Sequence, residues 1–258
     1  MIDNAMTLLL AEDLALQFLE VSTEAALRTV LDSATRQMGF DHYALSYTPR
    51  PERALEASLL FHDYPEAWAR VYTGFDLAGR DPVRRACDKS LCGFEWRNLG
   101  QLIPMTCGDR HMLAVGQRCG VGDGYTVPRH IPGEASGSCS FVVRPGVDLP
   151  RTRLMAAEIV GGFALTSARR LAGLRRVPAK PVLSDRQREC VVWSARGKSA
   201  PEIAIILGIS RETVIQHLKM ARERYEVHCR QSLVLHALYD GLVGFADVFR
   251  WTDWSGRI

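Results

Sequence analysis

Residues 183–225 read LSDRQRECVVWSARGKSAPEIAIILGISRETVIQHLKMARERY and contain three consecutive helix starts. Three serines are N-cap candidates, and the first two have the capping-box spacing to Gln187 and Glu202: Ser184, Ser199 and Ser210. Gly197 and Gly208 stand where left-handed residues would end the first two helices. The stretch therefore predicts two short helices, a tight connection and a third helix that begins after Ser210.

This third helix has an apolar and a polar face. Its apolar residues recur at helical spacing and form the predicted buried stripe: Val214, Leu218, Ala221 and Tyr225. Polar and charged side chains point the other way: Thr213, Gln216, Lys219, Arg222 and Glu223. Two short helices followed by such a helix are typical of a helix-turn-helix, whose third helix enters the DNA major groove. On spacing alone, a helical hairpin with a solvated charged face remains the alternative.

The residues of this stretch resemble the LuxR-type DNA-binding domain. The shared motifs are Leu-Ser-x-Arg-x-x-Glu at 183–189, Gly-Lys-Ser at 197–199, Glu-Ile-Ala at 202–204, Ile-Ser at 209–210 and Thr-Val-x-x-His-Leu at 213–218. Ala237 and Gly241-Leu242 continue the pattern in a fourth helix. The resemblance implies an all-α, four-helix helix-turn-helix domain over residues 183–244. It also implies that the protein binds promoter DNA as a homodimer.

Six side chains of the third helix and its ends are candidates for DNA contacts. Long or planar polar side chains in the middle of the helix suit base edges: Gln216, Lys219 and Arg222. We expect the remaining three to contact phosphates: Thr213, His217 and Arg224. Ile215 stands where the family usually has lysine, so a phosphate contact is lost or an apolar contact with a thymine methyl is gained.

Composition sets limits on the rest of the chain. With 258 residues, 47% of them hydrophobic, the chain can form one or two domains with a sizeable core. The net charge is only +3, but the part from Arg176 onward carries +4, which suits a DNA-contacting module. Seven cysteines without a C-x-x-C pair predict reduced thiols, with no zinc site and no disulfides.

The sequence predicts a cytoplasmic protein. The N-terminus lacks a basic stretch leading into an apolar core, and no segment approaches the 18 or so apolar residues of a membrane span. We therefore expect no association with membranes.

Residues 1–175 predict a mixed α/β domain with terminal helices around several short strands. The predicted helices are 3–20, 24–39, 68–73, one from Asp81-Pro82, 111–119 and 149–174. The predicted strands are 40–47, 57–61, 124–127 and 137–143, with a turn at Pro132-Gly133. The segment 93–107 has no regular pattern. This order predicts an α-β-α sandwich, and the proline-containing residues 176–182 predict a linker to the second domain.

A second resemblance covers this domain. The motifs Tyr64-Pro65-x-x-Trp68-x-x-x-Tyr72, Asp81-Pro82-Val83, Trp96 and Gly124-x-Thr126-x-Pro128 look like the autoinducer-binding domain of LuxR-type quorum-sensing regulators. The resemblance implies a transcription factor, not an enzyme, that needs no cofactor and binds an N-acyl-homoserine lactone. The ligand-binding residues would be Tyr64, Trp68, Tyr72, Asp81, Trp96, Met112, Thr126 and Ser140.

The residue types suit the polar groups of such a ligand. The donor-only indole of Trp68 suits the lactone carbonyl, and the acceptor-only carboxylate of Asp81 suits the amide N–H. Tyr64 or Ser140 would donate to the amide carbonyl. Trp96 would cover the lactone ring, while Tyr72 and Met112 would line the acyl tail. Taken singly, an aspartate such as Asp81 is more often a plain N-cap than a ligand anchor, and aromatic residues such as Trp68, Tyr72 and Trp96 are more often core residues than a binding site.

Other functions fit less well. A phosphoacceptor receiver domain needs clustered acidic residues and repeated strand-helix units, and neither is found. An enzyme would need a metal cluster, a phosphate loop or a nucleophile elbow, and Gly137-Ser138 lacks the G-x-S-x-G frame. A LuxR-type regulator that responds to a different small molecule cannot be separated from a lactone receptor by sequence.

Three departures from the family pattern concern the pocket and the C-terminus. Gly116 stands where alanine is usual, which predicts either a deeper pocket or a looser helix. The segment Leu99–His111 is unlike the family, so the length or aromatic nature of the acyl group is not predicted. The aromatic tail Phe245–Ile258 goes past the usual end, and we expect it to have a structural role, packing on the other domain or on a second subunit.

Overall fold

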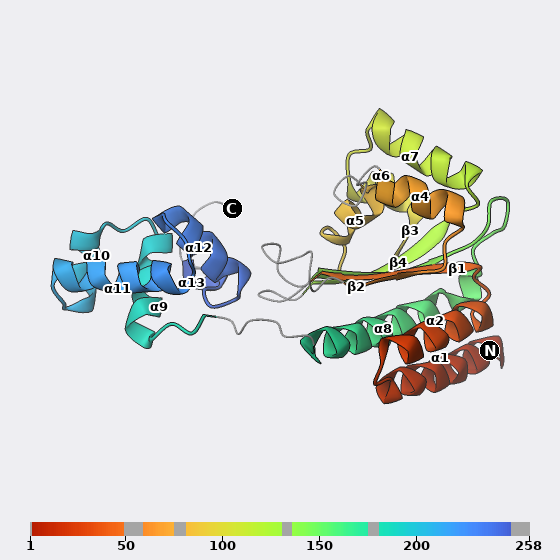
Figure 1. The fold of residues 1–258 in the computed structure, drawn as a ribbon, viewed down its shortest axis with the longest axis horizontal. Helices are drawn as coiled ribbons and strands as arrows, with labels where there is room; N and C mark the ends of the chain where they lie inside the picture. Colours follow the sequence, from red (N-terminus) through yellow and green to blue (C-terminus); the bar gives the residue numbers. More distant parts are fainter. Residues whose placement is uncertain (1, 49–58, 75–80, 131–135, 175–180, 249–258) are drawn as a thin grey trace. The chain divides into compact units, whose positions relative to one another are not determined.

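A computed structural model describes residues 2–48, 59–74, 81–130, 136–174 and 181–248. The chain divides into two compact units with a boundary after residue 177 (Figure 1). No helix in these described ranges is both long and apolar enough to cross a membrane.

The first unit contains a five-stranded antiparallel sheet. Its strands are β1 (His42–Thr48), β2 (Leu59–His62), β3 (Phe94–Glu95), β4 (Gly124–His130) and β5 (Ser136–Val142). They lie in the order β2-β1-β5-β4-β3. Successive side chains of a strand point to opposite faces, so the register decides which residues meet on each face. Ala44, Ser140 and Thr126 lie opposite one another across β1, β5 and β4. Two residues along, Ser46 lies opposite Ser138.

Three long helices cover one face of this sheet: α1 (Ile2–Glu20), α2 (Glu24–Gln37) and α8 (Leu154–Leu174) (Figure 1). Thr23 caps α2 by accepting a hydrogen bond from the Ala26 N–H. The sheet residues on this side are large and apolar, and they are fully buried with Leu14 and Phe18 of α1. They include Leu45, Phe61, Val127 and Phe141. This layer is the main core of the unit.

The opposite face of the sheet is covered by shorter helices (Figure 1). They are α4 (Glu66–Gly74), α5 (Pro82–Cys87), α6 (Leu99–Leu102) and α7 (Cys107–Arg118), together with the 3-10 turn η3 (Trp96–Asn98). Asp81 caps α5 and Pro82 is its first residue, as predicted. The predicted α-β-α sandwich is therefore confirmed.

Several predicted boundaries were wrong. The segment 93–107 is not irregular, because it contains β3, η3 and α6. Helix α7 begins four residues earlier than predicted, since Thr106 and Asp109 form a capping box. Helix α8 begins at Leu154 instead of Leu149, after the 3-10 turn η4 (Arg151–Arg153), whose N-cap Pro150 is not helical. A proline also disfavours the helical conformation at the residue before it, here Leu149. The predicted turn at 132–133 and most of the linker lie outside the described residues.

The second unit is helical, with α9 (Asp185–Ala195), α10 (Ala200–Leu207), α11 (Arg211–Arg224), α12 (Arg230–Tyr239) and the short α13 (Phe245–Val248). The capping box of Ser184 with Gln187 and that of Ser199 with Glu202 are both present. Ser210 accepts from the Thr213 N–H at the start of α11. The predicted left-handed glycines Gly197 and Gly208 have φ angles of 80° and 65°.

The end of the second unit differs from the prediction in one respect. Ala237 lies in α12, but Gly241 and Leu242 follow that helix, because Gly241 is left-handed with φ 69°. The first residues of the tail pack on α9: the Asp247 carboxylate pairs with Arg188 at 3.2 Å. The remaining residues of the tail, 249–258, lie outside the described residues.

Candidate ligand pocket and DNA-binding unit

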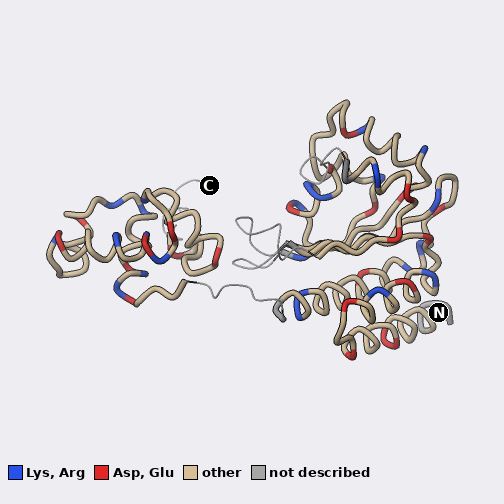
Figure 2. Tube along the Cα trace, viewed as in Figure 1, with Lys and Arg blue, Asp and Glu red and all other residues tan. Residues whose placement is uncertain are grey.

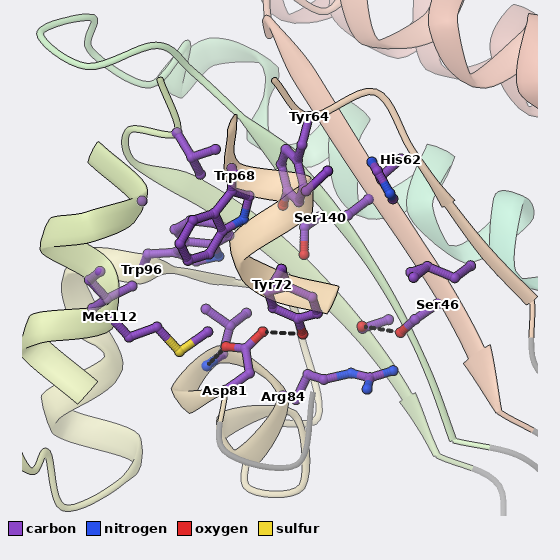
Figure 3. A pocket seen from close by; sticks show the side chains of 18 of the residues that line it. Ser46, His62, Tyr64, Trp68, Tyr72, Asp81, Arg84, Trp96, Met112 and Ser140 are labelled. Atoms are coloured by element: carbon purple, nitrogen blue, oxygen red, sulfur yellow. Dashed lines mark hydrogen bonds between the residues drawn. The ribbon is translucent and has the colours of Figure 1, made fainter. Parts of the chain in front are cut away.

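A cavity of about 270 Å³ lies between the sheet and the second helical layer of the first unit. Side chains from β1, β2, β5, α4, α5 and α7 line it (Figure 3). Its volume is close to the lower end of the range for small-molecule pockets, about 300–1,000 Å³. Seven of the eight predicted ligand-binding residues lie in its wall: Tyr64, Trp68, Tyr72, Asp81, Trp96, Met112 and Ser140.

The eighth residue, Thr126, is fully buried and does not line the cavity. Its hydroxyl accepts from the Trp96 indole N–H at 2.8 Å and pairs with the Ser140 hydroxyl at 2.8 Å. Thr126 therefore holds two wall residues in place from behind.

The indole ring of Trp96 also packs directly on the backbone of Gly124. A Cβ atom on Gly124 would lie 2.6 Å from the Trp96 Cε2 atom, closer than real contacts allow. Gly124 is therefore required for the close approach of the ring. Together, Gly124 and Thr126 fix the position of the Trp96 wall.

The Asp81 carboxylate accepts two hydrogen bonds within the protein. The Val83 N–H donates to Oδ1 at 2.8 Å, and the Tyr72 hydroxyl donates to Oδ2 at 2.9 Å (Figure 3). Burial raises the pKa of Asp81, while these two hydrogen bonds and the Arg84 guanidinium oppose the rise. Each carboxylate oxygen keeps acceptor capacity for one further donor. Asp81 is therefore both the N-cap of α5 and an acceptor in the pocket wall.

Tyr64 and Trp68 form the wall beside β2 and α7. Burial raises the pKa of the Tyr64 hydroxyl well above its usual value, so this hydroxyl remains a donor at neutral pH. The Trp68 ring is 6% exposed and lies near Tyr72, with ring centroids 5.9 Å apart. A Cβ atom on Gly116 would lie 3.7 Å from the Trp68 ring, an ordinary contact distance. The space beside Trp68 thus admits the alanine that is usual at this position.

Sequence reasoning missed several wall residues. On the strands they share one face of the sheet, alternating with the buried core residues: Ala44, Ser46, Leu60, His62 and Ser138. On α5, Arg84 lies one turn after Asp81 and so faces the same way. Strand alternation and helical spacing were signals that could have found them. His62 stacks on Tyr64 with ring centroids 5.8 Å apart.

In the second unit, α11 has the predicted buried stripe. Val214 and Ala221 are fully buried, and Leu218 packs against both apolar clusters of the unit. Four of the six candidate DNA contacts are exposed: Thr213, Gln216, Lys219 and Arg224. Ile215 is also exposed, at 45%. Figure 2 shows basic and acidic residues interspersed along the helices of this unit.

The other two candidates, His217 and Arg222, are half-buried. The Arg222 guanidinium donates to the His228 carbonyl at 3.2 Å. Arg224, although exposed, donates to the carbonyl of Val182. Both arginines are therefore held by backbone of the unit itself. Among the described residues, Lys219 has only a loose contact of 3.9 Å with Glu223.

Comparison with known proteins assigns both units. Residues 23–171 match the family described as autoinducer binding domain, and residues 181–237 match bacterial regulatory proteins of the luxR family. The transcriptional activator protein AhyR of Aeromonas hydrophila is 24% identical over 241 residues, covering 90% of this chain and 93% of that protein. The quorum sensing-dependent regulator RpaR of Rhodopseudomonas palustris is 28% identical over 222 residues, covering 84% and 88%.

Solved structures share the fold. The crystal structure of Escherichia coli SdiA is similar with a TM-score of 0.68 and 23% identity, covering 91% of this chain and 98% of that one. The structure of CepR2 from Burkholderia cenocepacia has a TM-score of 0.53 at 16% identity, covering 66% and 99%. Since the autoinducer-binding match alone spans more than half of the chain, the protein belongs to the LuxR family of bacterial transcription regulators, with an autoinducer-binding domain followed by a helix-turn-helix domain.

Proposed function

We propose that this regulator binds an N-acyl-homoserine lactone in the pocket of its first unit. The observation that carries the proposal is that donors and one strong acceptor from separate elements meet around a single cavity. Trp68 comes from α4, Asp81 from the start of α5 and Ser140 from β5. A buried polar group left unpaired costs roughly 1–3 kcal/mol, so the wall selects a ligand that offers two carbonyls and one N–H.

Each ligand group then has a partner. The Trp68 indole N–H donates to the lactone carbonyl, and Trp96 covers the lactone ring. The Asp81 carboxylate accepts from the amide N–H while the Tyr72 hydroxyl holds it in place. Tyr64 or Ser140 donates to the amide carbonyl, and Tyr72 and Met112 line the acyl group. Thr126 contributes indirectly, by holding Trp96 and Ser140.

The protein would act on DNA as a homodimer in which α11 of each copy enters the major groove of a promoter. In this unit the exposed Gln216 and Lys219 are the side chains best placed for base edges. Arg222 would have to leave the His228 carbonyl to do so. Three further side chains would contact phosphates or support such contacts: Thr213, His217 and Arg224. Thr213 lies in the first turn of α11, three residues after the N-cap Ser210, and this place suits a phosphate at a helix N-terminus.

A thermal-shift screen of the full chain tests the lactone. The panel contains acyl-homoserine lactones from short to long and from aliphatic to aromatic. A ligand at about 100 times its Kd adds roughly 2.7 kcal/mol to stability, which raises the melting temperature by several degrees.

Matched variants decide whether the shift comes from the pocket. Asp81→Asn and Trp68→Phe should lose most of the shift. Asp88→Asn, which changes an exposed aspartate at the end of α5, and Trp193→Phe in the second unit should keep it. A folded protein that responds to no lactone would contradict the proposal and favour a regulator that responds to another small molecule.

A further inference from the structure

One end of the pocket is polar in a way that the lactone and amide do not require. Ser46 and Ser138 face each other across β1 and β5, and their hydroxyls are 3.1 Å apart. Arg84 of α5 lines the same cavity. In Figure 3 its guanidinium extends toward the side of the pocket where Ser46 lies, away from Trp68 and Trp96. A plain hydrocarbon chain would have no partner for any of these groups.

The strand register places this polar end relative to the amide. Ser138 precedes Ser140 by two residues on β5 and points to the same face, a step of about 7 Å along the strand. On the other side of Ser140, Val142 packs with Trp68 and Val121. The three positions Val142, Ser140 and Ser138 therefore mark the lactone end, the amide and the distal acyl end in turn.

Arg84 supplies a positive charge at the distal end. It interacts electrostatically with the Asp81 carboxylate, but its guanidinium forms no ion pair and no hydrogen bond with any residue that the structure describes, and the side chain is half-buried. A guanidinium offers five N–H donors and no acceptor. A partly desolvated guanidinium whose donors are unused within the described structure is stabilised by an acceptor brought by a ligand, and charge-assisted hydrogen bonds of this kind are among the stronger ones.

We propose that the acyl group of the ligand carries a hydrogen-bond acceptor, a hydroxyl or a carboxylate, at its distal end, bound by Arg84 and the Ser46–Ser138 hydroxyl pair. The inference rests on the proposed lactone-binding function and names the class of acyl group. Because the polar end lies only about one two-residue strand step from Ser140, the acyl group is short.

The test compares lactones that differ only at the end of the chain. Hexanoyl-homoserine lactone and its derivatives with a hydroxyl or a carboxyl on the last carbon are titrated into the full chain by calorimetry. One of the two derivatives should bind about tenfold or more tightly than the hexanoyl compound, as expected for a hydrogen bond to a charged group.

Variants separate Arg84 from general effects on the pocket. Arg84→Met should abolish this preference while the hexanoyl compound still binds. The control is Arg110→Met. It removes an exposed arginine of α7, a helix whose other residues line the pocket, and it should preserve the preference. If Arg84→Met does not fold, the double variant Ser46→Ala with Ser138→Ala carries the test, and it should weaken the preference.

The outcomes are distinct. Equal affinity for all three lactones, or a preference that survives in Arg84→Met, would overturn the distal acceptor and leave the lactone function standing. A folded protein that binds none of these lactones and none of the wider panel would overturn the lactone function itself.

Discussion

The contact between Gly124 and Trp96 allows a quantitative prediction. A methyl group at position 124 would lie 2.6 Å from Cε2 and 2.9 Å from Cδ2 of the indole. The ring cannot turn aside freely, because its N–H is bound to Thr126 at 2.8 Å. Gly124→Ala therefore forces the ring to move, which costs about 1–3 kcal/mol for overpacking and about 1 kcal/mol for the lost hydrogen bond.

The same substitution at Gly116 serves as the control. Its methyl group would meet the Trp68 ring at 3.7 Å, an ordinary contact, and Gly116 lies inside α7. Replacing a glycine by alanine inside a helix stabilises it by roughly 0.5–1 kcal/mol. The two Gly→Ala changes, both beside a tryptophan of the pocket wall, are thus expected to have opposite signs.

Thermal unfolding of the full chain measures both effects. For a unit of this size, 1 kcal/mol corresponds to about 2–4 °C. Gly124→Ala should lower the first-unit transition by roughly 5–10 °C and weaken lactone binding, since Trp96 would leave the place over the lactone ring that we propose for it. Gly116→Ala should raise that transition by roughly 1–4 °C. A Gly124→Ala protein with unchanged melting temperature and lactone affinity would refute the assignment of Trp96 as a fixed wall.

Three further predictions follow from other contacts. Lys219→Ala should weaken binding to an operator selected from random DNA by about 1 kcal/mol or more, while Glu223→Ala should not; an unchanged binding curve would remove Lys219 from the base contacts. Because burial raises the pKa of Asp81 above 3.8, lactone affinity measured by titration at several pH values should be full at neutral pH and fall as the pH drops through this raised pKa, a dependence that Asp81→Asn should lack. The stability of the ligand-free protein should change in the opposite direction with pH. Because the Asp81 pKa is higher in the folded than in the unfolded state, the free energy of unfolding of the first unit falls as the pH rises through the same pKa. Ser184→Ala removes the N-cap of α9 and should lower the thermal transition of the second unit by roughly 5 °C, about 1 kcal/mol; no change would show that the Gln187 side chain suffices.

Local signals predicted the second unit well. The cap of α9 depends on Ser184 and Gln187 alone, three residues apart, and it is present as predicted. The left-handed Gly208 is also set locally, by the need to end α10 before α11 begins. Where the prediction of helix α8 was wrong, the error was an overlooked local signal, because Pro150 already marks a break.

Most of the pocket residues that were predicted belong to a motif. Trp68 and Asp81 belong to such motifs, and both line the cavity. Ser46 and Ser138 are 92 residues apart, and they meet only through the pairing of β1 with β5. Single-sequence patterns contain no information on which strands pair. Arg84, in contrast, follows Asp81 by three residues on one helix, so its place in the wall could have been inferred.

The donors on the sheet support the same account of the ligand. The first pair of hydroxyls belongs to Thr126 and Ser140. The Trp96 indole N–H donates to the Thr126 hydroxyl, and one hydroxyl hydrogen joins Thr126 to Ser140. If Thr126 donates, the Ser140 hydrogen is left to face the cavity, beside the place of the amide carbonyl. In the second pair, one of the two hydroxyl hydrogens joins Ser46 to Ser138, and the Ser138 hydroxyl also interacts with the Cys87 thiol. If Ser138 donates to Ser46, the Ser46 hydrogen is left to face the cavity. With these orientations the face of the sheet offers one spare donor at each of two places about 7 Å apart, and a ligand with two acceptors at that separation satisfies both.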